Sequence, residues 1–169
     1  MHGSSYPPDT HVRFVDSHSH LADPAFDADR ETVIERAIGA GASIVVCIGA
    51  SLEDAARARE LAARYPLLRW TAGLHPQDAA RFDATTDLPA LEKLLDAGAV
   101  AVGECGLDFH YDNAPRPKQH ESFEAQLSIA AERSLPVIVH TRDATCFENL
   151  FLGSARPCER DVLFDGAVE

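Results

Sequence analysis

Long apolar runs, paired cysteines and glycine-rich phosphate loops are all missing from this chain of 169 residues. No run approaches the roughly 20 apolar residues that a membrane-spanning helix needs, so we expect no membrane association. None of the four cysteines lies in a CxxC pair, which argues against a zinc knuckle or a disulfide framework. Neither GxGxxG nor GxxxxGKS/T occurs, so the sequence does not support a nucleotide cofactor.

Basic residues are also scarce, with 15 Lys and Arg against 27 Asp and Glu and a formal net charge of −12. Strong non-specific binding to nucleic acid draws on many basic side chains that face phosphates, so this balance argues against it. It leaves room for a nuclease that grips its substrate locally, through metal ions and a few arginines.

The first residues are polar and contain a Pro-Pro pair, without the basic start and apolar stretch of a signal peptide. We therefore expect a disordered tail over 1–11, one domain over 12–169 and a cytoplasmic location. Apolar residues make up 46% of the chain, which suffices for a real core.

Strand and helix signals alternate along the chain. Short apolar, β-branched runs predict strands, and longer stretches with apolar residues at helical spacing predict helices. The strands are expected at 12–16, 44–48, 68–72, 99–103 and 136–139, with a possible sixth at 161–164, and the helices at 27–41, 52–65, 88–97 and 118–133. This order predicts parallel strands covered by helices, in either an open doubly wound sheet or a (β/α)8 barrel.

The positions of five polar residues favour the barrel. They are His18, His20, His75, Glu104 and His140, and each stands just after an expected strand. The carboxyl ends of the strands form the rim of a barrel where active sites lie, so convergence from several strands is natural there. A complete barrel typically takes about 250 residues, so we expect an incomplete one with about five to six of the eight βα units.

The pentapeptide DSHSH at 16–20 carries the strongest chemical signal. It closes an apolar run, and residues two apart on a strand point to the same face. Asp16, His18 and His20 therefore share a face, with both imidazoles aimed at one point. Two neutral imidazoles on a rigid edge make half of a metal site.

Glu104 is the next candidate, in the segment GECGLD at 103–108. The glycines on either side let the backbone bring the carboxylate into a crowded site. Its two oxygens can bridge two cations, as in sites that generate hydroxide and clamp a phosphoryl oxygen. His140, at the end of an apolar strand, is a candidate for a third imidazole ligand.

Four neighbouring residues have less specific signals. Arg142, two residues after His140, is a candidate to receive a phosphate. His75, in the segment GLHP, is expected to face the substrate or to support a ligand. Asp108 is expected to hold a ligand histidine in one tautomer or to orient a water, which places it with Glu104 among the catalytic candidates. Cys105 directly follows Glu104, so a role of its thiol as a nucleophile stays open as an alternative.

Taken together, these segments resemble the TatD family of metal-dependent deoxyribonucleases. The matching motifs are DSHSHL at 16–21, GLHP at 73–76, GECGLD at 103–108 and PVIVHTRDA at 136–144. The resemblance implies an amidohydrolase-like (β/α)8 barrel and hydrolysis of phosphodiester bonds in DNA.

The resemblance also implies a pair of divalent metal ions. His18 and His20 would bind one ion, Glu104 would bridge the two, and His140 would bind the second. His and carboxylate ligands suit zinc, manganese or, less well, magnesium.

The family pattern continues with a ligand histidine in an HCFxG motif and an aspartate in an ETD motif, and this sequence has neither. We therefore expect a C-terminally truncated member of the family. Two alternatives stay open. One is a non-catalytic remnant, and the other is an amidohydrolase that acts on a small ester, lactone or amide. The binuclear amidohydrolases that resemble this chain usually carry a carbamylated lysine where Glu104 stands.

Overall fold

The structure is a computed structural model that describes residues 13–111, 113–144 and 162–165. The tail expected over 1–11 lies outside the described residues. None of the helices within the described ranges has the length and apolar character needed to cross a membrane.

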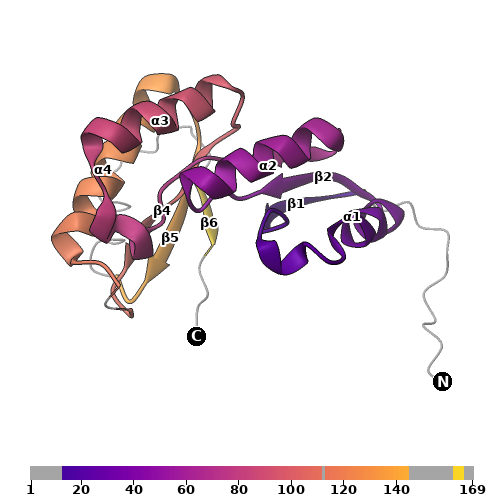
Figure 1. The fold of residues 1–169 in the computed structure, drawn as a ribbon, viewed down its shortest axis with the longest axis horizontal. Coiled ribbons are helices and arrows are strands. Elements are labelled where there is room, and N and C mark those ends of the chain that lie inside the picture. Colours follow the sequence, from indigo (N-terminus) through magenta and orange to yellow (C-terminus); the bar gives the residue numbers. More distant parts are fainter. Residues whose placement is uncertain (1–12, 112, 145–161, 166–169) are drawn as a thin grey trace.

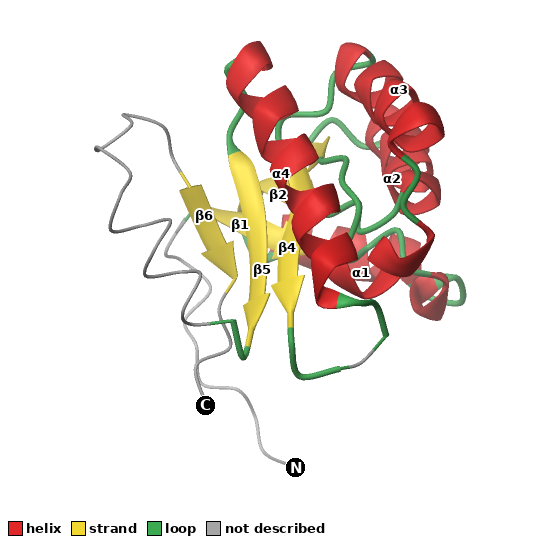
Figure 2. Cartoon of the chain, turned by 90° about the vertical axis from the view of Figure 1, so that its left-hand side faces the viewer, coloured by secondary structure: helices red, strands yellow, loops and turns green. Residues whose placement is uncertain are grey.

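Parallel strands form the framework of the described chain. They are β1 (Phe14–Ser19), β2 (Ala42–Cys47), β3 (Leu68–Trp70), β4 (Val102–Asp108), β5 (Val137–Arg142) and β6 (Val162–Asp165). The first three pair in chain order, and so do the last three (Figure 2). A parallel bridge between Ala72 and Val102 joins the two sets, and the Gly103 N–H donates to Ala72 O over 2.8 Å. Spatial order therefore follows chain order, which confirms barrel-type winding and not a doubly wound sheet.

Helices connect the strands and pack along them (Figure 1). They are α1 (Arg30–Gly39), α2 (Leu52–Arg64), α3 (Ala84–Asp96) and α4 (Arg116–Arg133), with the short 3-10 helices η1 (Pro24–Phe26) and η2 (Pro76–Arg81). Side-chain caps fix two of the helix starts, because Ser51 accepts from the Asp54 N–H and Asp83 accepts from the Thr85 N–H. The cap at Asp83 explains why α3 begins four residues before the predicted Leu88.

The predicted ends of β4 and β5 are wrong, and the difference changes where Glu104 and His140 lie. β4 does not end at Gly103 but continues to Asp108, so Glu104 lies inside the strand and not after it. β5 continues past Val139 to Arg142, so His140 also lies inside a strand. The backbone at both positions is therefore held by neighbouring segments: the Glu104 N–H donates to Gly49 O over 3.2 Å, and His140 pairs with Gly106 of β4 and Asp165 of β6.

Gly106 explains why β4 continues where the sequence indicated a turn. Its φ is +145°, and a Cβ at this position would lie 2.0 Å from His140 O. Glycine here permits the close approach of two strand backbones, and any side chain would collide with β5.

Side chains alternate between the two faces of the strands. On β2, Val45 and Cys47 belong to the large core cluster under α1, α2 and α3. Val46 and Ile48 instead pack with Ile138 of β5 in a small cluster on the opposite face. His140 is two residues beyond Ile138, so it shares that opposite face, at its carboxyl end.

Candidate metal centre

Two histidines converge at the end of β1. The Nε2 atoms of His18 and His20 lie 3.1 Å apart, and Ser19 between them points the other way, because its hydroxyl donates to Val46 O. Asp16 stabilises the turn of the backbone by accepting from the His18 N–H over 3.1 Å. The paired imidazoles that the sequence predicts are therefore present.

Glu104 lies between this pair and the histidine on β5. Its side chain is only 5% exposed, and its two oxygens face different partners. Oε2 lies 4.0 Å from Nε2 of His18, and Oε1 lies 3.2 Å from Nδ1 of His140. One carboxylate thus separates two sets of imidazoles.

These contacts define two groups of residues that could each hold a cation. The first group is His18, His20 and Glu104, and the second is His75, Glu104 and His140; in each, the potential ligand atoms lie within 4.8 Å of one another. Glu104 is the one member common to both. The nitrogen and oxygen donors in each group match those that zinc, manganese and related divalent ions accept.

The structure places His75 among these ligand atoms. His75 precedes η2, and its Nδ1 accepts from the Gln77 N–H over 3.2 Å, which leaves Nε2 as the other donor atom. Its ring centroid lies 4.4 Å from that of His140. The sequence predicts that His75 faces the substrate or supports a ligand, and the geometry brings it together with Glu104 and His140.

Asp108 holds His140 from the other side. Its Oδ2 lies 3.2 Å from His140 Nε2 and accepts from the Gln77 amide over 2.7 Å. Its Oδ1 accepts from the N–H groups of His110 and Tyr111, each over 3.1 Å. A carboxylate on one ring nitrogen fixes the histidine tautomer and leaves the other nitrogen to bind, which is the arrangement that supports metal ligands.

Burial and charge set the protonation of these groups. Burial alone would raise the pKa of the Glu104 carboxyl, but the hydrogen bond with His140 and the charges of nearby histidines outweigh it and lower the pKa. Burial lowers the pKa of His75, and the neighbouring His140 lowers it further. Burial also acts to lower the pKa of His140, but Glu104 and Asp108 outweigh it and raise the pKa. Glu104 is therefore ionised and His75 neutral near pH 7, the forms in which each binds a cation.

Two buried glutamines support the centre, although the sequence motifs assign neither of them a role. Gln119 and Gln126, on α4, are 1% and 0% exposed. Gln119 accepts from the Asp108 N–H and donates to Asp108 O, and Gln126 makes the same pair of bonds with the backbone of Leu74. Seven residues apart on a helix, they share a face with apolar Phe123 and Ala130. In the sequence, two glutamines seven residues apart on the apolar face of a predicted helix are the signal that indicates such a supporting role.

Arg142 and Cys105 differ in their access to solvent. Arg142 lies on β5, where it pairs with Asp108 of β4, and its side chain is exposed. Its guanidinium carbon lies 5.0 Å from the centroid of the Tyr111 ring. Cys105 is fully buried with its Sγ 3.8 Å from Ile138 O, and burial strongly raises the pKa of its thiol. Because the thiolate is the nucleophile, this environment argues against a catalytic cysteine.

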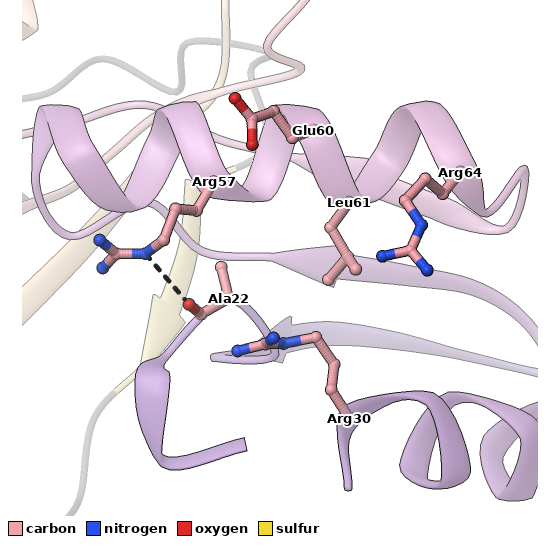
Figure 3. A pocket seen from close by; sticks show the side chains of 6 residues that line it. All are labelled: Ala22, Arg30, Arg57, Glu60, Leu61 and Arg64. Carbon is pink, nitrogen blue, oxygen red and sulfur yellow. Dashed lines mark hydrogen bonds between the residues drawn. The ribbon is translucent and has the colours of Figure 1, made fainter. Parts of the chain in front are cut away.

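A separate hollow of about 200 Å³ lies between the segment after β1, α1 and α2 (Figure 3). Three arginines line it, and each forms an ion pair with a carboxylate. The arginines are Arg30, Arg57 and Arg64, and their partners are Asp27, Asp54 and Glu31. The hollow therefore offers no unpaired cationic group, and it contains none of the histidines described above.

Comparison with known proteins agrees with the chemistry of the two groups. The family model for TatD related DNase matches residues 15–152. The chain is 44% identical over 128 residues to the 3'-5' ssDNA/RNA exonuclease TatD of Dickeya dadantii, covering 74% of this chain and 48% of that protein. It is 40% identical over 132 residues to the uncharacterized metal-dependent hydrolase YabD of Bacillus subtilis, covering 77% of this chain and 51% of that protein. The chain thus spans about half the length of the curated relatives it matches.

A solved structure supports the same assignment. YJJV, a TatD homolog from Escherichia coli, superposes with a TM-score of 0.76 and 32% sequence identity, over 85% of this chain and 56% of that chain. The residues that the family model matches, 15–152, include every residue of both groups. This chain therefore belongs to the family of TatD-related DNases.

Proposed function

We propose that this chain is a hydrolase of phosphodiester bonds in nucleic acid, with two divalent cations held by the two groups that share Glu104. One observation carries the proposal: the two oxygens of Glu104 face His18 and His140, on opposite sides of one carboxylate. A bridging carboxylate of this kind is suited to a pair of cations a few ångströms apart. Zinc, manganese and magnesium are the candidate ions.

Each residue has a defined task in this proposal. When bound, the cation pair lowers the pKa of a water and neutralises charge on the phosphodiester. His18 and His20 hold the first position, and His140, with His75 beside it, holds the second. Glu104 remains ionised and serves both.

Asp108 and Arg142 complete the assignment. Asp108 accepts from His140 Nε2–H, so that Nδ1 is directed toward Glu104. Arg142, at the carboxyl end of β5, receives a phosphate of the substrate. An exposed arginine next to the centre is consistent with local binding of a phosphate by a chain whose formal net charge is −12.

The substrate class follows from the relatives. The curated relative from Dickeya dadantii is named as a 3'-5' exonuclease of single-stranded DNA and RNA. We propose single-stranded nucleic acid, DNA in particular, as the substrate of this chain, and the cytoplasm as its location.

The first test is thermal unfolding with and without excess Mn²⁺ or Zn²⁺. Ligands that bind the folded state raise its stability, so the parent chain should melt at a higher temperature with metal. A His18→Ala/Glu104→Gln variant should lose this shift. The matched control, His120→Ala/Glu124→Ala, removes one histidine and one glutamate from α4 and should keep it.

Hydrolysis of a labelled single-stranded oligodeoxynucleotide then separates binding from catalysis. Metal-dependent cleavage by the parent and the α4 control, but not by the His18/Glu104 variant, would support the proposal. A metal shift without cleavage would rule out the nuclease activity and leave a metal-binding protein without catalysis. If metal shifts neither melting curve, the two groups do not form a working metal site.

A further inference from the structure

We propose that the exposed ring of Tyr111 is a stacking platform for a nucleobase beside the metal centre, with Arg142 on the adjoining phosphate. The inference rests on the proposed function and adds to it how a single strand is positioned. Neither the paired imidazoles nor the shared carboxylate requires Tyr111, because its side chain belongs to neither group.

The exposure of Tyr111 is the first observation. Its surface is 43% exposed, which places it among the exposed large apolar and aromatic side chains of the described residues. Phe14 and Val15, also exposed, lie at the amino end of β1, on the far edge of the sheet from the centre. Tyr111 instead follows the carboxyl end of β4, the edge at which the two groups lie.

The backbone of Tyr111 is held by a carboxylate that also contacts the metal centre. Its N–H donates to Asp108 Oδ1 over 3.1 Å, while Asp108 Oδ2 faces His140 Nε2 over 3.2 Å. A single buried carboxylate therefore holds both the backbone of Tyr111 and a candidate ligand. A base on this ring would therefore lie at the edge of the sheet where both groups lie.

The side chains around the ring complete the platform. The Arg142 guanidinium carbon lies over one face of the ring, 5.0 Å from its centroid, and the His110 ring stands at 87° to it with the two ring centroids 4.7 Å apart. His110 is in turn held by Asp143, 3.0 Å from its Nδ1. Among the described residues, no carboxylate forms an ion pair with Arg142, so a phosphate would not have to displace one.

Proteins that bind single-stranded nucleic acid commonly combine an aromatic ring with an arginine. Every base has a flat face that can stack, and the guanidinium binds the backbone next to it. A base in a duplex is already stacked on both sides, so the platform would favour single-stranded substrates. The relevant ligand is therefore a single strand whose bases are unpaired.

The test is direct binding of a fluorescein-labelled oligothymidylate, followed by fluorescence anisotropy in EDTA at low salt. Loss of one stacked base weakens binding, so Tyr111→Ala should bind about 5- to 100-fold more weakly than the parent. Tyr111→Phe keeps the ring and should bind like the parent. Phe14→Ala, which removes a ring of similar exposure, 40%, from the opposite edge, is the matched control and should also bind like the parent.

An oligomer with abasic sugars in place of the nucleosides separates the two contacts. Arg142→Gln should weaken binding of both ligands, whereas Tyr111→Ala should weaken only that of oligothymidylate. Equal binding of oligothymidylate by the parent and Tyr111→Ala, or no binding by the parent, would overturn the inference. Because EDTA removes metal, these outcomes are independent of the cleavage assay that tests the proposed function.

Discussion

The side-chain amide of Gln126 on α4 forms two hydrogen bonds with the backbone of Leu74, as a neighbouring strand would. The two residues are 52 positions apart in the sequence. Its Oε1 accepts from the Leu74 N–H over 2.9 Å, and its Nε2–H donates to Leu74 O over 3.1 Å. Leu74 directly precedes His75, so the amide fixes the segment that presents this histidine. Gln119 makes the equivalent pair with Asp108, and one helix face thereby positions both residues.

Replacing Gln126 with alanine should cost substantial stability. Two backbone groups of Leu74 would lose their partners in a partly buried setting, and each such group costs about 1–3 kcal/mol. We expect the free energy of unfolding, measured by urea denaturation, to fall by about 3 kcal/mol. The exposed Glu124→Ala, on the same helix, should change it by less than about 0.5 kcal/mol. Equal effects of the two substitutions would show that the paired amide contributes nothing.

Asp108→Asn should weaken metal binding without unfolding the protein. Asparagine keeps the shape and can still accept from the N–H groups of His110 and Tyr111, but it loses the charge that faces His140. Substituting such a partner of a ligand typically lowers metal affinity about 10- to 100-fold. Isothermal titration with Zn²⁺ measures the change, and Asp143→Asn, an exposed Asp-to-Asn change, is the control. Unaltered affinity in Asp108→Asn would contradict the role assigned to this carboxylate.

Gly106→Ala should disrupt the junction of β4 and β5. The new Cβ would lie 2.0 Å from His140 O in a backbone conformation that L-residues rarely adopt. Strain and overpacking each cost about 1–3 kcal/mol, so we expect a loss of about 3 kcal/mol or more. Gly39→Ala, at the end of α1 where nothing lies within 4 Å of the new Cβ, should instead be neutral or gain up to about 1 kcal/mol. The opposite ranking in thermal melts would show that the strands do not approach this closely.

The cap of α3 predicts a pH dependence of stability. Hydrogen bonds from the Thr85 hydroxyl and N–H lower the pKa of Asp83, so the folded state holds its proton less tightly than the unfolded state. The cap therefore stabilises fully above the unfolded pKa of about 4, and this contribution is lost as the pH falls through the lower folded value. Between about pH 6 and pH 3, the parent should lose more melting temperature than Asp83→Asn, which cannot titrate there. Parallel loss in both proteins would contradict the cap.

The convergence of His18, His20, Glu104 and His140 could be predicted from two simple regularities, although the sequence wrongly placed Glu104 and His140 after their strands and not inside them. Side chains two apart on a strand share a face, and parallel strands end at a common edge. These rules need no knowledge of packing. Whether the four residues bind metal remains a prediction that the experiments above test.

The supporting contacts could not be predicted in the same way. Gln126 meets Leu74 only after α4 has packed against the strands, and no local pattern specifies a contact between such distant residues. The sequence does not predict the full extent of β4 for a related reason, because a glycine such as Gly106 is compatible with two local structures. It can mark a turn or the close approach of another backbone, and only the position of His140 decides between them.

The order of the strands also bears on how the protein is made. Neighbours along the sheet are neighbours along the chain, so β2 can pair as soon as it follows β1, and each later strand finds its partner already present. During synthesis from the amino terminus, the framework can grow one βα unit at a time. The paired imidazoles of β1 would emerge first, and both cation-binding groups would be complete only once His140 has left the ribosome.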